Sequence, residues 1–438
     1  MRRVDLASVR MEQITTPTWK EALRYWFLLG CTSFGGPAAQ IAMMHEELVE
    51  KRKWISAGKF LNALNFCMLL PGPEAQQLAI YLGWRLHGIR GGIAAGALFV
   101  IPSVVILFLL SWLYMSAGHI TWVASIFHGF APAVIAIVFS AVWRIGKKTL
   151  RTPLLLCLAS ASFLLVYFHI TSFLILMAGA AIIGVIAWRY FPNQVKVKSH
   201  HHGDEKSLDN DDSTHMGEVT WQRSAKIAFI SILLWSLPMI AAAYYLGGSS
   251  HLFAKGIFFS KAALVTFGGA YAVLPYVSEH AVVTHAWLSQ SQMMTGLGLA
   301  ETTPGPLIMV LQFVGFVSGW QHTDGMSTLL AASLGALMTT WVTFLPGFML
   351  VLIGAPYVEK LSKISVISAM LGAITACVVG QIMHLGVTFS QHALWPIGNH
   401  GIDYFVAIMA VASFAAMIRF KISPMLVLLA CALSGLIF

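Results

Sequence analysis

The chain has 438 residues, of which 58% are hydrophobic and only 10% are charged. Soluble globular chains carry about 25% charged residues, so this chain lacks the polar surface that water would require on all sides. Soluble enzymes, disordered scaffolds and secreted disulfide modules are therefore excluded, and we expect an integral membrane protein. The net charge of +9 fits Lys and Arg that hold the cytoplasmic ends of helices, and no nucleic-acid partner is expected.

The cysteines and the N-terminus carry no export or metal signal. The five cysteines are odd in number, widely spaced and embedded in apolar sequence, so neither a disulfide framework nor a metal site is predicted: Cys31, Cys67, Cys157, Cys377 and Cys431. The N-terminal segment is basic and polar with no apolar core behind it, which argues against a signal peptide.

Nine segments have the length and apolar character of membrane spans. Residues 91–143 contain no charged residue and are long enough for two spans, with the turn at 116–120. Residues 152–188 must also turn, at 169–171, because one helix of that length would exceed the hydrocarbon thickness. Five further spans are predicted at 227–246, 329–353, 364–387, 404–418 and 423–438.

Two earlier segments are interrupted. Residues 22–50 contain Phe34-Gly35-Gly36-Pro37, and residues 60–87 contain Pro71-Gly72-Pro73. Such breaks leave backbone groups unpaired, which is tolerated at membrane depth only where protein or a water-filled cavity covers them, so we expect broken helices or re-entrant hairpins. As hairpins entered from the cytoplasm they leave only two of the 27 Lys and Arg outside, Lys255 and Lys261. Full crossings would leave six outside, so the positive-inside rule favours hairpins.

A polar linker separates two halves. Residues 192–224 include ten charged residues and the run His200-His201-His202, which is a metal-binding tract in an alternative interpretation. The predicted organisation is a cytoplasmic N-terminal segment, a first transporter repeat, a cytoplasmic linker, a connecting transmembrane helix and a second repeat, at 1–21, 22–191, 192–224, 225–250 and 251–438.

The two halves repeat each other. Phe34-Gly35-Gly36 recurs as Phe267-Gly268-Gly269, and Pro71-Gly72-Pro73 recurs as Pro304-Gly305-Pro306, each after 233 residues (267 − 34 and 304 − 71). Trp54, Ser56 and Glu46 recur at the same offset as Trp287, Ser289 and Glu279. The chain is therefore expected to be a duplication.

The connecting helix would bring the second half into the membrane from the outside, so the repeats should be inverted. Paired, interrupted segments in inverted repeats are typical of secondary transporters with a site near the midplane. We predict an all-α integral membrane protein of two inverted repeats with broken or re-entrant helices, about nine full spans plus four hairpins, or about 13 hydrophobic segments.

Helices that restart after the breaks would direct free amides and a positive dipole end into the interior. Four such starts follow Pro37, Pro73, Gly269 and Pro306. They favour a small anionic substrate. The alternative is that these glycines and prolines only permit close helix packing.

Charged residues near the breaks are candidates for coupling or gating. Glu74 follows the first Pro-Gly-Pro and Glu301 precedes the second; a carboxylate at membrane depth suggests proton coupling, although Glu74 also complements a helix dipole. Glu46 and Glu279 are paired by the repeat and should share a role. Lys261 either attracts anions at the outer mouth or reaches to the interface. Arg85 and Arg90, with His87, form a cytoplasmic basic cluster that anchors the topology or attracts substrate.

These motifs, with the run Leu69 to Ala79 and the run Ala300 to Leu307, resemble the two-domain bacterial chromate ion transporters over nearly the whole chain outside the linker. The resemblance implies an inner-membrane exporter of chromate, with sulfate as an analogue, that confers chromate resistance. One departure is that Pro37 follows the first Phe-Gly-Gly and Ala270 the second. The predicted substrate pathway comprises Phe34, Gly35, Gly36, Pro37, Pro71, Gly72, Pro73, Gln76, Gln77, Lys261, Phe267, Gly268, Gly269, Thr302, Thr303, Pro304, Gly305 and Pro306.

The sequence allows three alternatives to a chromate exporter to be compared. An intramembrane enzyme would need a nucleophile with a base or a metal set, and no such motif is present; His45-Glu46-Glu47 lacks the second histidine. A structural or sensory membrane protein would not require duplicated broken helices. A transporter of sulfate or another small anion, with proton-coupled import, remains the main alternative. No cofactor is expected.

Overall fold

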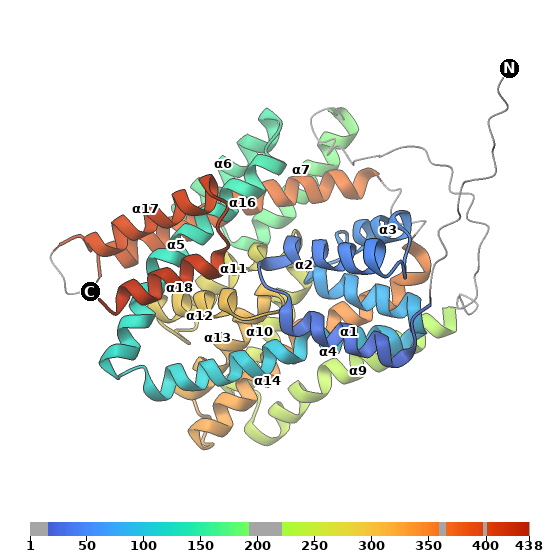
Figure 1. The fold of residues 1–438 in the computed structure, drawn as a ribbon, viewed down its shortest axis with the longest axis horizontal. Helices are drawn as coiled ribbons and strands as arrows, with labels where there is room; N and C mark the ends of the chain where they lie inside the picture. The colour runs from blue at the N-terminus through green and yellow to red at the C-terminus, as the bar shows by residue number, and fades with distance from the viewer. Residues whose placement is uncertain (1–15, 192–220, 359–364, 397–400, 438) are drawn as a thin grey trace.

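Every secondary-structure element that the computed structural model describes, in residues 16–191, 221–358, 365–396 and 401–437, is a helix (Figure 1). Six helices are long and apolar enough to cross a membrane, so the predicted all-α membrane fold is confirmed. The number of crossings stays a prediction. The first half consists of α1 (Trp19–Thr32), α2 (Gly36–His45), a π-helix (Glu46–Lys51), α3 (Ala57–Cys67), α4 (Glu74–Ala117), α5 (Thr121–Thr149), α6 (Pro153–Tyr167) and α7 (Phe173–Tyr190).

A connecting helix and the second half follow. The predicted turn at 169–171 falls between α6 and α7, and of the predicted turn at 116–120, residues 118–120 fall between α4 and α5 while 116 and 117 end α4. The linker residues 192–220 and the N-terminal residues 1–15 lie outside the described residues. The remaining elements are α9 (Trp221–Leu246), α10 (His251–Val265), α11 (Ala270–Ser278), a π-helix (Glu279–Thr284), α12 (Gln290–Thr302), a short 3₁₀ turn (Leu307–Met309), α13 (Val310–Gln321), α14 (Thr328–Gly354), a second 3₁₀ turn (Ala355–Tyr357), α16 (Ser365–Leu394), α17 (Tyr404–Arg419) and α18 (Pro424–Gly435).

The sequence repeat is also a structural repeat. The two π-helices begin and end 233 residues apart (279 − 46 and 284 − 51). The long helix α4 bends sharply at His87 and Gly88, where Gly88 has φ 63° and ψ −156°. Residue 87 corresponds to position 320, next to the end of α13. Each half therefore contains a short helix after its Pro-Gly-Pro turn and then a long apolar helix.

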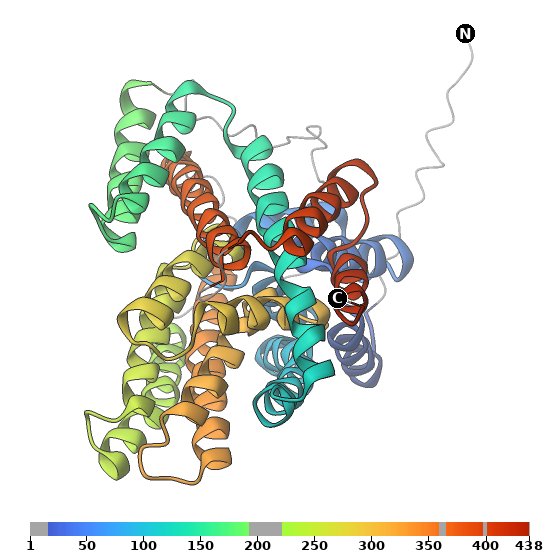
Figure 2. The same cartoon turned by 90° about the vertical axis from the view of Figure 1, so that its left-hand side faces the viewer.

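The last three helices of each half exchange partners. Helices α6 and α7 pack on α16, whereas α17 and α18 pack on α5, and α5 contacts α16; Figure 2 shows α6 and α7 beside α16. A side chain at Gly380 would overlap the backbone of Ala159, and one at Gly435 would overlap the backbone of Ser125. Small residues let helix backbones approach closely in membranes, so these contacts bind the halves into one interleaved body.

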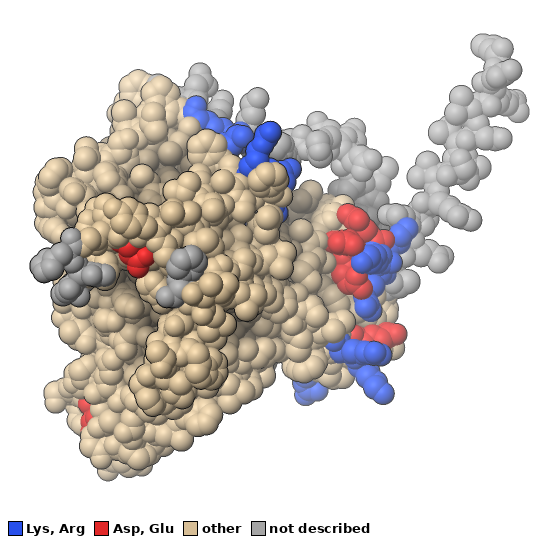
Figure 3. Space-filling view, turned by 60° about the vertical axis from the view of Figure 1, so that its left-hand side comes forward, with Lys and Arg blue, Asp and Glu red and all other residues tan. Residues whose placement is uncertain are grey.

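The surface fits a lipid environment. Only 6% of the apolar window of α9 is buried, and this helix lies at the edge of the molecule in both ribbon views (Figures 1 and 2). On the face drawn in Figure 3, Lys and Arg gather along the upper margin and, mixed with Asp and Glu, along the right margin, and the broad remaining area is almost free of charge. Charged side chains are costly at membrane depth, so this area suits contact with lipid.

Candidate functional site

The two Phe-Gly-Gly motifs break helices because their glycines adopt left-handed backbone angles. Gly35 and Gly36 have φ of 93° and 78°, and Gly268 and Gly269 have φ of 84° and 95°. Residues with a side chain pay a steric penalty at such angles. Helix α1 therefore ends before the first motif and α2 begins at Gly36, while α10 and α11 flank the second motif.

The Pro-Gly-Pro turns work in the same way. Gly72 has φ 119° and Gly305 has φ 99°. Helix α4 begins at Glu74, directly after the first turn, and the 3₁₀ turn that leads into α13 begins at Leu307, after the second. Both turns lie in the interior, since Gly72 and Gly305 are buried.

The helix starts at the four breaks carry no side-chain cap. No N-cap side chain accepts a hydrogen bond from the first-turn amides of α2, α4, α11 or the 3₁₀ turn at Leu307. Among the other described helix starts, α1 and α12 have complete capping boxes, from Thr18 with Glu21 and from Ser289 with Gln292, whereas α5, α6, α7 and α14 also lack a side-chain cap. First-turn amides have no partner within their own helix, so the uncapped starts present donors to the interior.

The breaks of the two halves are joined in crossed pairs. The Gly72 amide donates to the carbonyl of Thr266 at 2.8 Å, and the Gly305 amide donates to the carbonyl of Ser33 at 2.9 Å. Ser33 and Thr266 directly precede the two Phe-Gly-Gly motifs and correspond under the 233-residue offset (266 − 33). Each Pro-Gly-Pro turn therefore lies beside the Phe-Gly-Gly break of the other half.

Buried amides fix these turns. Gln77 Nε2 donates to the Pro71 carbonyl at 2.7 Å, and Gln40 Nε2 donates to the carbonyls of Gly305, at 2.5 Å, and Ser33. The Ser103 hydroxyl of α4 donates to the Pro304 carbonyl. Gln40 and Ser103 were not among the predicted site residues. A single polar residue in an apolar helix does not reveal from the sequence which distant turn its side chain contacts.

Gln76 is the most notable polar group beside the first turn. Its side chain is fully buried, and neither its amide nitrogen nor its amide oxygen has a hydrogen-bonding partner in the described structure. Its oxygen lies 3.2 Å from where a Cβ on Gly347 of α14 would be. Buried polar groups are almost always paired, so this free amide is suited to a polar ligand.

Each Pro-Gly-Pro turn has a carboxylate near it, and each carboxylate lies within electrostatic range of a cation of α5. The Tyr271 hydroxyl donates to Glu301 Oε1 at 2.6 Å, and the Arg144 guanidinium interacts with Tyr271 and with the charge of Glu301. Glu74 lies in the electrostatic field of Lys148. Its Oε1 is 3.8 Å from the Cβ position of Gly269, so it belongs to the crossed pair formed by the first turn and the second Phe-Gly-Gly.

The threonines before the second turn stabilise its backbone. The Thr302 hydroxyl donates to the Leu299 carbonyl at 2.8 Å and the Thr303 hydroxyl donates to the Ala300 carbonyl at 3.0 Å. Thr303 is buried, whereas Thr302 and the first Phe-Gly-Gly-Pro are half-buried.

Lys261 lies away from this interior. It is exposed on α10, while Lys255 of the same helix is only 1% exposed. Six residues correspond to about 600° of helix rotation, which leaves the two side chains about 120° apart. Lys255 faces α14, with its Nζ 3.5 Å from the Cβ position of Gly335. The sequence prediction named the lysine nearer to the break. Lys255 precedes the buried Phe259 by four residues and Ala262 by seven, so all three lie on the same face of α10. This spacing is the sequence signal that Lys255 is the buried lysine.

The remaining predicted acids and bases lie at the ends of the helices. Arg85 and Arg90 flank the bend in α4. Glu46 and Glu279 each begin a π-helix, away from the glycine turns. Glu46 is exposed and pairs with Lys51 at 2.9 Å. The structure therefore does not bring these four residues together with Glu74 and Glu301.

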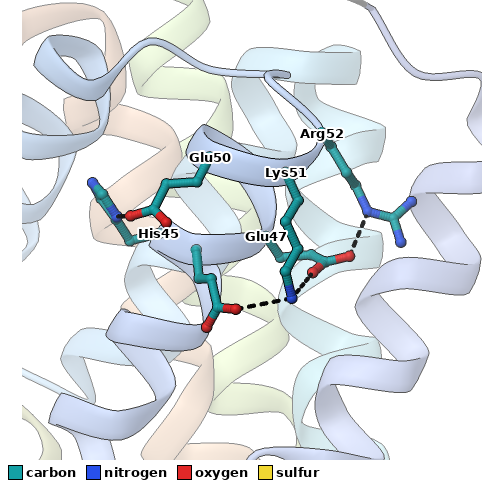
Figure 4. A network of polar contacts seen from close by, with 6 residues as sticks. His45, Glu47, Glu50, Lys51 and Arg52 are labelled. Carbon is teal, nitrogen blue, oxygen red and sulfur yellow. Dashed lines mark hydrogen bonds and ion pairs between the residues drawn. The ribbon is translucent and has the colours of Figure 1, made fainter.

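The first π-helix carries its own charge network (Figure 4). Lys51 Nζ lies 3.4 Å from Glu47, Arg52 Nε lies 2.9 Å from Glu47, and His45 lies 3.2 Å from Glu50. Burial raises the pKa of Glu47, but hydrogen bonds from Arg52 and Lys51 outweigh it and hold that pKa below its ordinary value. These ion pairs lie in the segment that connects α2 to α3. Within the described residues, no group of three His, Cys, Asp or Glu side chains could hold a metal ion.

Comparison with known proteins identifies the family. A family model described as Chromate transporter matches residues 20–185 and again 253–436. The two matches begin 233 residues apart (253 − 20), which is the offset of the repeated motifs. The chain belongs to the chromate transporter family. The suspected resemblance is therefore confirmed, and membership makes this a multi-pass membrane protein of a transporter family.

Curated relatives share nearly the whole length of this chromate transporter family member. It is 28% identical over 429 residues to a chromate transport protein of Cupriavidus metallidurans, covering 97% of this chain and 94% of the relative. It is 31% identical over 414 residues to a chromate transport protein of Pseudomonas aeruginosa, covering 93% and 89%. A probable chromate transport protein of Synechococcus elongatus is 28% identical over 423 residues, covering 96% and 95%. No solved structure matches the chain.

Proposed function

We propose that this protein is a secondary transporter that exports chromate across the bacterial inner membrane and so confers chromate resistance. It carries out no catalytic step and needs no cofactor. Sulfate is a second cargo, because chromate and sulfate are both tetrahedral dianions of similar size. Relatives named as chromate transport proteins support the choice of chromate.

The crossed pairs of uncapped helix starts carry this proposal. Amide groups at a helix start, together with the positive end of the dipole, bind oxyanions without a charged side chain. Placing two such starts on each half, at corresponding positions of a repeat, is the arrangement in which transporters bind substrate between repeats. Inversion of the halves lets either side of the site open while the other is closed.

Proton-coupled import of sulfate is the alternative function, and the buried Glu301 favours it. Only 5% of this residue is exposed, and carboxylates at membrane depth commonly carry protons. Two protons would cancel the charge of a dianion, and Glu74 and Glu301 are two carboxylates near the turns. The direction of net flux under a proton gradient distinguishes this function from export.

Counterflow in liposomes tests transport and selectivity together. Vesicles containing purified protein and unlabelled sulfate should accumulate labelled sulfate transiently, and protein-free vesicles should not. Chromate should compete with the label about as well as sulfate does, since charge and shape are shared. The absence of counterflow with both dianions, from protein shown to be folded, would refute the proposal.

A further inference from the structure

A basic pocket of 660 Å³ opens where α5 ends beside the α17–α18 turn. Its lining includes five cationic side chains and no acidic one. We call this cavity the basic pocket, and it is lined by Ser140, Trp143, Arg144, Lys147, Lys148, Arg151, Met417, Ile418, Lys421, Ile422, Ser423 and Pro424.

The cations form a stripe because of helical spacing. Arg144 follows Ser140 by four residues, and Lys147 and Lys148 follow Arg144 by three and four, so these residues cluster on one side of α5, and Arg151 follows the end of the helix. Lys421 comes from the opposite wall, in the turn before α18. Such an array collects anions from solution, because like charges that line a cleft raise the local potential.

The wall opposite α5 adds a helix start. Ser423 is the N-cap of the twelve-residue helix α18, and Pro424 is its first residue. The positive end of the α18 dipole therefore lies at the pocket together with the five cations. Both features select for a compact ligand of negative charge.

The basic pocket adjoins the interior site through two of its own cations. Arg144 interacts with Tyr271 and with the charge of Glu301, and Lys148 acts on Glu74. Arg144 and Lys148 are one helical turn apart on α5. The same two side chains that line the pocket thus neighbour the carboxylate beside each Pro-Gly-Pro turn.

We propose that the basic pocket is the cytoplasmic entrance of the pathway, where a tetrahedral oxyanion binds before Arg144 and Lys148 pass it to the interior site. This inference rests on the proposed transport function. The phosphate of an anionic lipid headgroup shares the chemistry of the ligand. The proximity of Arg144 to Tyr271 and to the charge of Glu301 favours the free oxyanion, because a lipid held there would obstruct the pathway.

A second cavity strengthens the assignment by contrast. It has a volume of 650 Å³ and is lined by uncharged residues of the end of α4, the second π-helix and the loop after it, the start of α12 and the end of α13: Tyr114, Val282, Ala286, Leu288, Ser289, Ser291, Gln292 and Gln321. In the proposed topology this cavity faces outward. A dianion would bind first at the basic pocket and would leave through this second cavity, which we call the neutral cavity.

Charge removal at the pocket mouth tests the entrance. The double variant Arg151→Gln/Lys421→Gln leaves Arg144 and Lys148 in place. Its KM for sulfate or chromate presented at the cytoplasmic face should rise about tenfold at low salt, with maximal flux nearly unchanged, because steering acts on capture. The rise should shrink at high salt, since salt screens the attraction. The matched control Lys20→Gln, an exposed cation of α1, should leave KM unchanged. An unaltered KM in the double variant would overturn the entrance assignment.

Thiol labelling tests occupancy directly. In a Cys157→Ser background, which removes the exposed native cysteine, Ile422→Cys places a thiol in the pocket. An anionic thiosulfonate reagent should label it faster than a cationic one, and sulfate should protect it. Adding Arg151→Gln/Lys421→Gln should weaken both effects, so that protection requires about tenfold more sulfate, in line with the expected rise in KM.

The outcomes separate the possible failures. Wild-type liposomes without counterflow would refute the transport function itself. Normal wild-type counterflow with an unprotected thiol at position 422 would refute only the entrance. Protection by anionic lipid but not by sulfate, compared with phosphatidylcholine alone, would assign the pocket to a lipid headgroup and would likewise overturn this proposal.

Discussion

At the scale of single residues, the interior contains a short hydrogen bond from the Tyr271 hydroxyl to the buried Glu301 carboxylate. The hydroxyl and the carboxylate are 2.6 Å apart, and Glu301 is buried. Losing one partner of a buried hydrogen bond costs about 1–3 kcal/mol. This contact therefore stabilises α11 against α12 whether or not Glu301 exchanges protons.

Variants of this pair should separate coupling from stability. We expect Glu301→Gln to flatten the pH dependence of flux while leaving sulfate binding largely intact. The amide oxygen can still accept the hydrogen bond from Tyr271, but the amide does not gain or lose a proton in this pH range. The matched variant Tyr271→Phe should lower thermal stability and keep the pH dependence. Flux measured over a pH series in liposomes checks both. An unchanged pH profile in Glu301→Gln, and in Glu74→Gln, would limit both carboxylates to structural roles.

Residue roles were predictable from sequence only where a repeated motif marked them. The glycine turns and Glu301 stood beside motifs that occur twice. Neither Arg144, which follows the charge-free stretch 91–143, nor Tyr271 was among the predicted site residues. Their importance comes from contacts between helices distant in the chain, which one sequence does not encode in any local pattern.

At the scale of elements, the glycines at the helix breaks differ in how tightly their surroundings are packed. At Gly305 an added Cβ would overlap the Ser103 hydroxyl. At Gly36 no atom lies within 4 Å of the added Cβ, although φ is 78°. The two positions thus share the backbone cost and differ in the space available.

Alanine at these two glycines should report that difference. Gly36→Ala should cost about 1–2 kcal/mol, the penalty of a left-handed angle. Gly305→Ala should cost clearly more, because Ser103 must also move. Thermal unfolding in detergent measures both. Ser103→Ala should recover part of the loss in the Gly305→Ala protein and none in the Gly36→Ala protein. Equal losses at the two positions would contradict the packing at the second turn.

Helix breaks were predictable because glycine and proline act locally, and the turns fell where expected. The π-helices were not predicted. The first contains the charge network around Lys51 (Figure 4), and the second, with the sequence Glu279-His280-Ala281-Val282-Val283-Thr284, contains no Lys or Arg, so the two share no charge pattern that marks a π-helix in the sequence.

At the scale of the whole molecule, duplication predicted two halves but not their interleaving. Because α6 and α7 pack on α16 while α17 and α18 pack on α5, neither half can form its full set of contacts alone. The apolar faces involved look the same in sequence whether they meet lipid, their own half or the other half.

Dividing the chain within the linker tests this dependence. Residues 1–205 and 206–438, produced together, should copurify and catalyse sulfate counterflow, since the contacts between α5, α16 and their partners do not require the linker. Either piece alone should be unstable. A first piece that is stable and monomeric by itself would contradict the interleaved packing.

Membrane potential and charge placement together set the expected direction of transport. Moving one elementary charge through the potential is worth about 2.3 kcal/mol per 100 mV, so a dianion leaving an inside-negative cell gains about 4.6 kcal/mol. This sustains an outward gradient of about 2000-fold, at about 1.4 kcal/mol per factor of ten. In our proposal the dianion binds at the basic pocket on the cytoplasmic side and leaves through the neutral cavity on the other side.

A diffusion potential in oriented liposomes tests that direction. A potassium gradient that makes the cytoplasmic side negative should speed chromate exit from that side, and reversing the gradient should slow it. The basic-pocket variant Arg151→Gln/Lys421→Gln should keep the response to potential at saturating substrate, because it changes capture and leaves the transported charge unaltered. An exit rate indifferent to potential would mean that protons carried by Glu74 and Glu301 cancel the charge, and would favour coupled import over export.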